Sequence, residues 1–233
     1  INSVDPSRHD PAVCYIAGTM YKSGDYMPYL FKTSDYGKTW KQITNSIPPL
    51  HFTRALRADR KRQGLLYAGT EYGIYISYDD GANWKSFQLN LPITPVTDLA
   101  IKNNDLIIAT QGRSLYILDD LSVVQQRNES ITTKNLHVFT VNTAYRMPAS
   151  GRFGGFGGTM RNVGLNPPNG VVMNYFLKNI TDSTRLTVEI SDKNKKLIKT
   201  FATNSKENKI EINKGMNQFT WDMNYPPADR VEG

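Results

Sequence analysis

The sequence predicts an all-β protein: a partial β-propeller of about three four-stranded blades, followed by a β-sandwich domain. Three observations lead to this fold class. An eight-residue turn motif occurs twice, short apolar runs flank each copy, and a second series of short apolar runs follows a segment rich in glycine and proline. A chain of 233 residues is long enough to bury a core in each part.

The turn motif reads S/T-x-D-x-G-x-(T/N)-W. Its copies cover residues 33–40 and 77–84, and their aspartates, Asp35 and Asp79, lie 44 residues apart. A period of about 40–50 residues built from short strands is typical of a propeller or a related array. The motif therefore marks the same turn in two successive blades.

Four short runs around each motif copy predict the first two blades. They cover residues 1–6, 13–19, 29–33 and 40–43, and then 52–58, 65–70, 74–77 and 84–87. The triplet Ala-Gly-Thr begins at Ala17 in the first blade and at Ala68 in the second, which aligns the second strands at a distance of 51 residues. The triplets are 51 residues apart and the motif aspartates only 44, so the first blade has 7 extra residues between triplet and motif, which we place in the loop 20–28.

A third blade is predicted in a degenerate form. Residues 96–101, 105–110 and 114–118 predict three strands, but Leu-Asp-Asp-Leu at 118–121 stands where the turn motif would be. Residues 121–126 predict a short helix. Residues 136–141 predict a further strand, which we assign to the outer edge of this blade. The propeller part is thus expected to cover residues 1–145.

Glycine and proline dominate residues 146–169, which predict a linker. Five apolar runs then follow at short, even spacing: residues 171–178, 184–191, 197–201, 209–212 and 217–221. This spacing predicts a β-sandwich over residues 170–233, with a hairpin turn at Asp192. Two more strands are expected for a complete sandwich, so we expect the domain to be incomplete.

Composition excludes several classes of function. The formal net charge is +7; residues 1–126 have 13 basic and 12 acidic side chains, and residues 127–233 have 15 and 9. Neither a basic helix nor a nucleic-acid module accompanies this charge, so we expect no nucleic-acid partner. No apolar run is long enough to span a bilayer. The chain has no signal peptide, but it begins at Ile1 rather than Met and reads as a piece of a longer protein. Cys14 lies in an apolar run and is expected to be buried.

The turn motif resembles the Asp-box, or BNR, repeat of sialidase-like and sortilin-type propellers. Residues 65–77, 90–92, 96–99 and 109–120 strengthen this resemblance. Together these segments look like the last blades of bacterial sortilin-type propellers described as glycosyl hydrolase-like, in which an immunoglobulin- or fibronectin-like domain follows. That domain opens with Asn-Pro-Pro-x-Gly, as at residues 166–170 here, and holds a Trp-Asp pair, here Trp221 and Asp222. The resemblance covers nearly the whole chain and implies that further blades of the same protein are its partners. It does not specify an activity.

The motif residues themselves are predicted to be structural. The aspartate can accept hydrogen bonds from main-chain N–H groups of its own turn, and the glycine can adopt a positive φ. The tryptophan is expected to pack under the turn into the blade core. Each blade has a copy, whereas an active site needs a single constellation. The residues assigned to this role are Thr33, Asp35, Gly37, Trp40, Ser77, Asp79, Gly81 and Trp84.

By the resemblance, ligands are expected on the opposite face, at the loops that join second to third strands and one blade to the next. The candidate ligand-binding residues are Tyr21, Tyr26, His51, Arg54, Tyr72, Gln111 and Arg113. Glycoside hydrolysis would need two carboxylates across a cleft, and the candidates are Glu71 with Asp25 or Asp98. The same residues also fit a solvated polar rim, with Asp98 paired to an arginine in the central channel. The histidines lack metal-ligand spacing, and no metal or cofactor is expected.

We therefore predict an extracytoplasmic binding protein, secreted, periplasmic or on the outer cell surface, whose ligand is a protein, a peptide or a glycan. Catalysis is not evident in this part of the chain. Two alternatives stay open. One is a BNR-type glycoside hydrolase, sialidase- or xyloglucanase-like, with catalytic residues on missing N-terminal blades. The other is a structural component of a cell-surface or secretion assembly.

Overall fold

The computed structural model describes residues 1–146 and 168–225, so most of the predicted linker, including Asn166 and Pro167 of the Asn-Pro-Pro-x-Gly segment, lies outside the described residues. The fold is all-β, with several small antiparallel sheets. The chain divides into two compact units, Ile1–Gln125 and Gln126–Gly233. No helix among the described residues is both long and apolar enough to cross a membrane.

Three blade-like sheets form the first unit. The first has the order β1-β2-β3-β4 and the second β5-β6-β7-β8, while the third, β11-β10-β9, has three strands. The first sheet comprises β1 (Ser3–Pro6), β2 (Cys14–Met20), β3 (Asp25–Thr33) and β4 (Lys41–Gln42). The second comprises β5 (Thr53–Ala58), β6 (Leu66–Thr70), β7 (Gly73–Ser77) and β8 (Lys85–Ser86). The third comprises β9 (Val96–Lys102), β10 (Asp105–Thr110) and β11 (Leu115–Leu118). The predicted short helix is α1 (Ser122–Gln126).

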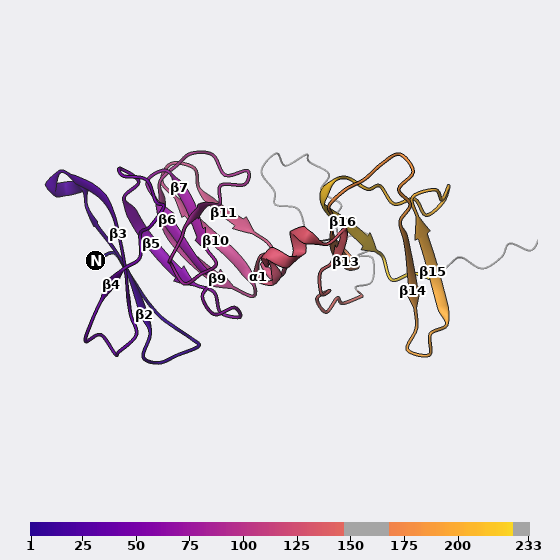
Figure 1. Cartoon of the computed structure of the whole chain (residues 1–233), viewed down its shortest axis with the longest axis horizontal. Helices are drawn as coiled ribbons and strands as arrows, with labels where there is room; N and C mark the ends of the chain where they lie inside the picture. Colours follow the sequence, from indigo (N-terminus) through magenta and orange to yellow (C-terminus); the bar gives the residue numbers. More distant parts are fainter. Residues whose placement is uncertain (147–167, 226–233) are drawn as a thin grey trace, which may run out of the picture. The chain divides into compact units, whose positions relative to one another are not determined.

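The three sheets stack face to face, with the second between the other two (Figure 1). One apolar cluster joins the first and second sheets and includes Leu30, Leu56 and Trp84. A second cluster joins the second and third sheets and includes Tyr67, Ile74 and Leu106. The second sheet therefore has two apolar faces, one toward the preceding sheet and one toward the following sheet.

The predicted alignment of the second strands is wrong by one residue. Ala68 pairs with Tyr75 in the second sheet, whereas Ala17 pairs with Leu30 in the first. Ile16, which pairs with Phe31, is the true counterpart of Ala68, because Phe31 and Tyr75 precede the two turn motifs by the same distance. A shift of one residue moves a side chain to the other face of a strand, so the alignment decides which residues face which sheet.

The loop predicted at residues 20–28 is more regular than expected. A 3₁₀ turn, η1 (Tyr21–Ser23), is followed by Gly24 in the left-handed conformation, and β3 begins at Asp25. Asp25 pairs with Met20, so the first two long strands form one extended hairpin. Main-chain pairing of Met20 with Asp25 therefore closes the tip of this loop.

The second unit contains two small sheets. Its three-stranded sheet, β12-β13-β16, comprises β12 (Leu136–Val138), β13 (Val171–Leu177) and β16 (Gly215–Trp221). The other sheet is the hairpin of β14 (Thr187–Ser191) and β15 (Leu197–Ala202), which turns at Asp192 as predicted. Phe201 and Phe219 meet edge to face, with ring centroids 4.7 Å apart. A 3₁₀ helix, η2 (Glu129–Thr133), precedes β12.

Two strand predictions in this unit are wrong. The strand expected at the outer edge of the third blade is β12, and it pairs with β13 of the second unit instead, with Leu136 opposite Leu177. The run 209–212 forms a single bridge from Lys209 to Ala202 rather than a strand. Both errors concern pairing partners, which local apolar patterns do not specify.

Candidate functional site

The two turn motifs form the same hydrogen-bond network. Asp35 accepts bonds from the main-chain N–H and the hydroxyl of Thr39, and from the hydroxyl of Thr33, while the N–H of Gly37 donates to Thr33 Oγ1. These bonds to the Asp35 carboxylate lower its pKa to about 2, because they favour the charged form. An aspartate that is held as an anion by its own turn stabilises that turn and does not act as an acid.

The second copy repeats these contacts. Asp79 accepts from Ser77 and from the N–H and side chain of Asn83, and the N–H of Gly81 donates to Ser77 Oγ. Burial raises the pKa of Asp79. The hydrogen bonds from Asn83 and Ser77 together lower the pKa by a larger amount, so the net shift is downward. Gly37 and Gly81 both have φ +84°, which favours glycine.

The two tryptophans of the motif differ, and the prediction for Trp40 is wrong. Trp84 is 3% exposed and packs between the first and second sheets, whereas Trp40 is 43% exposed. Trp84 is covered by the sheet that precedes it, and no sheet among the described residues covers Trp40. The burial of Trp84 thus comes from contact with the preceding sheet rather than from the core of its own blade.

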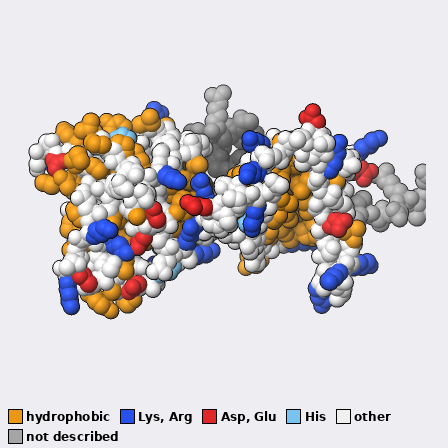
Figure 2. Space-filling view, viewed as in Figure 1, with side chains coloured by type: hydrophobic (Ala, Val, Ile, Leu, Met, Phe, Trp, Pro, Cys, Tyr) orange, Lys and Arg blue, Asp and Glu red, His pale blue; other side chains and the backbone are white. Residues whose placement is uncertain are grey.

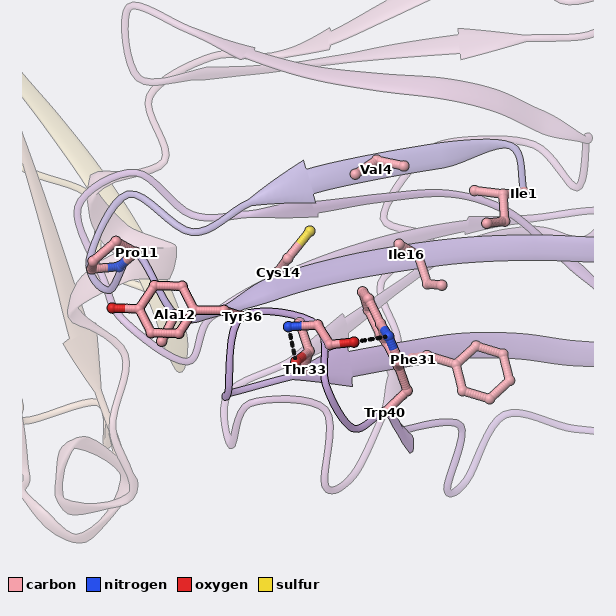
Figure 3. Close-up of a pocket in the computed structure, with 11 residues that line it drawn as sticks. Ile1, Val4, Pro11, Ala12, Cys14, Ile16, Phe31, Thr33, Tyr36 and Trp40 are labelled. Atoms are coloured by element: carbon pink, nitrogen blue, oxygen red, sulfur yellow. Dashed lines mark hydrogen bonds between the residues drawn. The ribbon is translucent and has the colours of Figure 1, made fainter.

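Trp40 borders an open apolar cavity of about 730 Å³ on the free face of the first sheet (Figure 3). Its walls include Val4, Ile16 and Phe31 from three neighbouring strands. Cys14 also lines this cavity and is half-buried, which corrects the expectation that it lies inside the core. Its pKa is raised, chiefly by burial, so the thiol form is favoured.

At the opposite end of the sheets, the β2–β3 hairpin, the start of β5 and the β6–β7 turn bring six of the predicted residues together. We call this group the Arg54 surface. Its members are Tyr21, Tyr26, His51, Arg54, Glu71 and Tyr72. Figure 2 shows apolar side chains gathered at this end of the first unit, at the upper left of the view.

Phe52 is the centre of the Arg54 surface. Its ring is 5.1 Å from that of Tyr21 and 6.0 Å from that of Tyr26, and the guanidinium of Arg54 lies 5.1 Å from its centroid. Phe52 itself is buried, while Tyr26 and Tyr72 are each 46% exposed. The sequence prediction missed Phe52, although it begins the second blade between two predicted residues, His51 and Arg54.

A salt bridge and a stacked pair hold the exposed part of the surface. Arg54 Nη2 lies 2.6 Å and Nε lies 2.8 Å from Glu71 Oε2. The rings of His51 and Tyr72 stack with centroids 4.4 Å apart, and His51 Nδ1 is 2.8 Å from the hydroxyl of Tyr75. Burial lowers the pKa of His51, which favours the neutral imidazole. Two exposed tyrosine rings therefore lie on the same surface as the Arg54–Glu71 ion pair.

The three candidate catalytic carboxylates lie in separate contacts. Glu71 binds Arg54, Asp98 Oδ1 lies 2.8 Å from Arg57 Nη2, and Asp25 accepts a hydrogen bond from the hydroxyl of Tyr29. The bond from Tyr29 lowers the pKa of Asp25, which stabilises its carboxylate. The Arg57–Asp98 pair confirms the arginine–aspartate pair expected along the inner strands, and it borders a polar cavity of about 440 Å³.

Two of the predicted ligand-binding residues, Gln111 and Arg113, stay outside the Arg54 surface. The N–H of Gln111 donates to Pro95, and its carbonyl accepts from Thr94. Within residues 1–146, no described contact joins Gln111 or Arg113 to Phe52 or to the residues around it. Both follow β10 in the third sheet, whereas the Arg54 surface is built from the first and second sheets.

The sequence matches no protein-family model and no curated protein. Parts of this chain are similar to proteins of known structure. YCF48 bound to D1 peptide is 22% identical with a TM-score of 0.36, over 51% of this chain and 36% of that chain. A GH74 enzyme from Niastella koreensis is 12% identical with a TM-score of 0.40, over 51% of this chain and 21% of the enzyme. The GH74 xyloglucanase from Xanthomonas campestris is 15% identical with a TM-score of 0.39, over 60% of this chain and 25% of the enzyme. The chain spans well under half the length of these three proteins, and at such scores the likeness assigns it neither an activity nor a ligand.

Proposed function

We propose that this chain is a non-catalytic binding module and that its ligand contacts the Arg54 surface. The observation that carries this proposal is that two exposed rings, Tyr26 and Tyr72, lie on the same surface as the Arg54–Glu71 ion pair. Flat rings give an apolar contact area at little cost in conformational entropy, and an ion pair on the same surface offers hydrogen-bond donors and acceptors. A glycan fits this arrangement, because its rings have apolar faces and hydroxyl edges; a peptide is the second candidate.

The state of the candidate acids supports binding over hydrolysis. A glycosidase needs one carboxyl group that can give up a proton and a second one across the sugar. Asp25 is stabilised as a carboxylate, and Glu71 and Asp98 are each paired with an arginine. The carboxylate of each of these three groups is thus already engaged by a neighbouring side chain.

The wider assignment is also a proposal. We propose that the first unit belongs to a sortilin-type BNR propeller, that the two small sheets of the second unit form an immunoglobulin-like domain, and that the protein works outside the cytoplasm. The paired turn networks at Asp35 and Asp79 support the first of these. Fractionation of the source cells tests the location, and recovery in the cytoplasmic fraction would contradict it.

Binding to an array of oligosaccharides, followed by calorimetry with any hit, tests the proposed function. We expect Tyr72→Ala to weaken binding at least tenfold, and Tyr145→Ala to leave it unchanged, because Tyr145 is an equally large exposed ring outside the surface. A peptide array in place of the glycans separates the two ligand classes. Turnover of any oligosaccharide that Glu71→Gln abolishes would replace the binding function with a hydrolase.

A further inference from the structure

The face of the first sheet that is turned away from the second sheet is apolar, like a face that another sheet covers. Val4, Ile16 and Phe31 form one row across β1, β2 and β3, because Val4 pairs with Ile16 and Ile16 pairs with Phe31. In the second sheet the same ladder positions hold Leu56, Ala68 and Tyr75. Those three residues are buried against the first sheet, with exposures of 0%, 0% and 8%, whereas Val4 is 56% exposed.

The turn next to this face repeats the contrast. Trp84 Nε1 donates to the main-chain oxygen of Ile43 in the preceding sheet at 2.6 Å, whereas Trp40 Nε1 donates to Gly37 within its own turn at 3.2 Å (Figure 3). A Cβ at Gly81 would lie 2.7 Å from Ile43, so the second turn presses on the preceding sheet. A Cβ at Gly37 would meet nothing closer than Trp40 itself, at 3.9 Å.

We propose that this face, formed by Val4, Cys14, Ile16, Phe31, Tyr36 and Trp40, seats a further four-stranded blade of the same repeat. The structure shows what such an occupant looks like, because the first sheet covers the equivalent face of the second with Val13, Tyr15, Ala17 and Leu30 and with the carbonyl of Ile43. The occupant must present a similar apolar row and a main-chain oxygen for Trp40. This inference does not depend on the Arg54 surface.

One difference between the two turns refines the partner. Asp80 of the second turn accepts a hydrogen bond from Tyr15 and an ion pair from Lys32, both on the first sheet. The first turn has Tyr36 at this position, which is 74% exposed. The occupant therefore needs an apolar or acceptor group opposite Tyr36 rather than a lysine.

A second copy of this chain is the competing occupant. The outer face of the third sheet exposes Leu115 by 66% and Ile117 by 60%, at the ladder positions where the second sheet has Ile74 and Ile76. The carbonyl that binds Trp84 follows the fourth strand, β4, of the covering sheet. Among the residues that the structure describes, the third sheet has three strands, β9 to β11, and no fourth strand that could carry such a carbonyl. A complete blade fits the face around Trp40 better than the third sheet of another copy.

The thiol of Cys14 reports on this face, since it is the one cysteine of the chain. We expect maleimide at pH 8.5 to label Cys14 in the folded 233-residue chain. In the folded protein isolated from its natural source, we expect the same label to react at least tenfold more slowly. Unfolding that protein should remove the difference in rate. Equal rates in the two folded proteins would overturn the proposal. Labelling of unfolded protein controls for the reactivity of the thiol itself.

Ultracentrifugation of the 233-residue chain separates the two occupants. We expect a monomer, or an association that Ile117→Lys does not change. A stable dimer in which Cys14 is protected, and which Ile117→Lys dissociates and deprotects, would assign the face to a second copy and overturn the proposed blade. As a folding control, Val4→Lys should leave the melting temperature of the 233-residue chain unchanged, and Leu56→Lys should lower it, because only Leu56 is covered in this chain.

Discussion

The indole Nε1 of Trp84 donates a hydrogen bond of 2.6 Å to the main-chain oxygen of Ile43, 41 residues earlier in the chain. The turn motif of one sheet is thereby fastened to the sheet before it. Asp80 strengthens this junction through Tyr15 and Lys32, and Asn45 adds a bond to the carbonyl of Ala82. The motif is therefore a device for joining blades as well as for closing a turn.

Truncation of the two motif tryptophans should have very different costs. Trp84→Ala removes a buried ring and its hydrogen bond, and we expect it to lower the free energy of unfolding by about 3–5 kcal/mol. Trp40→Ala removes a ring that is 43% exposed, and we expect a loss below about 1 kcal/mol. Urea unfolding followed by circular dichroism measures both. Similar losses would show that Trp40 is also covered in solution.

Asp79→Ala should destabilise the protein without weakening ligand binding. The substitution removes the acceptor for Ser77 and Asn83, and the expected loss is about 1–2 kcal/mol of unfolding free energy. Asp119→Ala, an exposed aspartate in the third blade, is the control and should change stability little. A loss of binding by Asp79→Ala at unchanged melting temperature would contradict the structural role.

The strands of the first unit could be predicted because their apolar runs are short, regular and separated by strong turn signals. The register between blades could not be predicted in the same way. The triplet beginning at Ala17 and at Ala68 suggested that these two alanines are equivalent. Cross-strand pairing shows instead that the pair Ile16–Phe31 of the first sheet corresponds to the pair Ala68–Tyr75 of the second. An identity of three small residues carries less information than a ladder of paired side chains.

The pairing of distant segments could not be predicted either. The run around Leu136 was recognised as a strand, but its partner, Leu177, lies beyond the residues that the structure leaves undescribed. The burial of Trp40 could not be predicted for the same reason. Trp40 and Trp84 end the same turn motif, but in the part of the chain that the structure describes only Trp84 is covered by a preceding sheet. At the Arg54 surface, loop positions predicted the exposed tyrosines, while the buried Phe52 beneath them required the packing to be seen.

Alanine at the two motif glycines should separate backbone strain from crowding. Both glycines have φ +84°, where an L side chain costs about 1–2 kcal/mol. Gly81→Ala also places a Cβ 2.7 Å from Ile43 Cδ1 and 2.9 Å from its Cβ, whereas a Cβ in Gly37→Ala meets nothing closer than Trp40, at 3.9 Å. We expect Gly81→Ala to cost clearly more than Gly37→Ala in urea unfolding, and Ile43→Ala to reduce the difference in a double-mutant cycle. Equal losses for the two glycines would mean that the sheets separate freely at this turn.

The imidazole of His51 should make stability depend on pH just below neutrality. Burial between Tyr72 and Tyr75 lowers its pKa below the ordinary value of about 6.5, so the unfolded chain takes up a proton before the folded protein does. The stabilisation of the folded state is present above pH 6.5 and is lost as the pH falls toward the folded pKa. We expect the melting temperature to fall between pH 7 and pH 5 more steeply in the wild type than in His51→Gln. NMR titration of the ring measures the cause directly. Tyr72→Ala, which uncovers the ring, should move its pKa up toward the ordinary value, and a pKa that does not move would show that the stacked tyrosine is not what excludes water from His51.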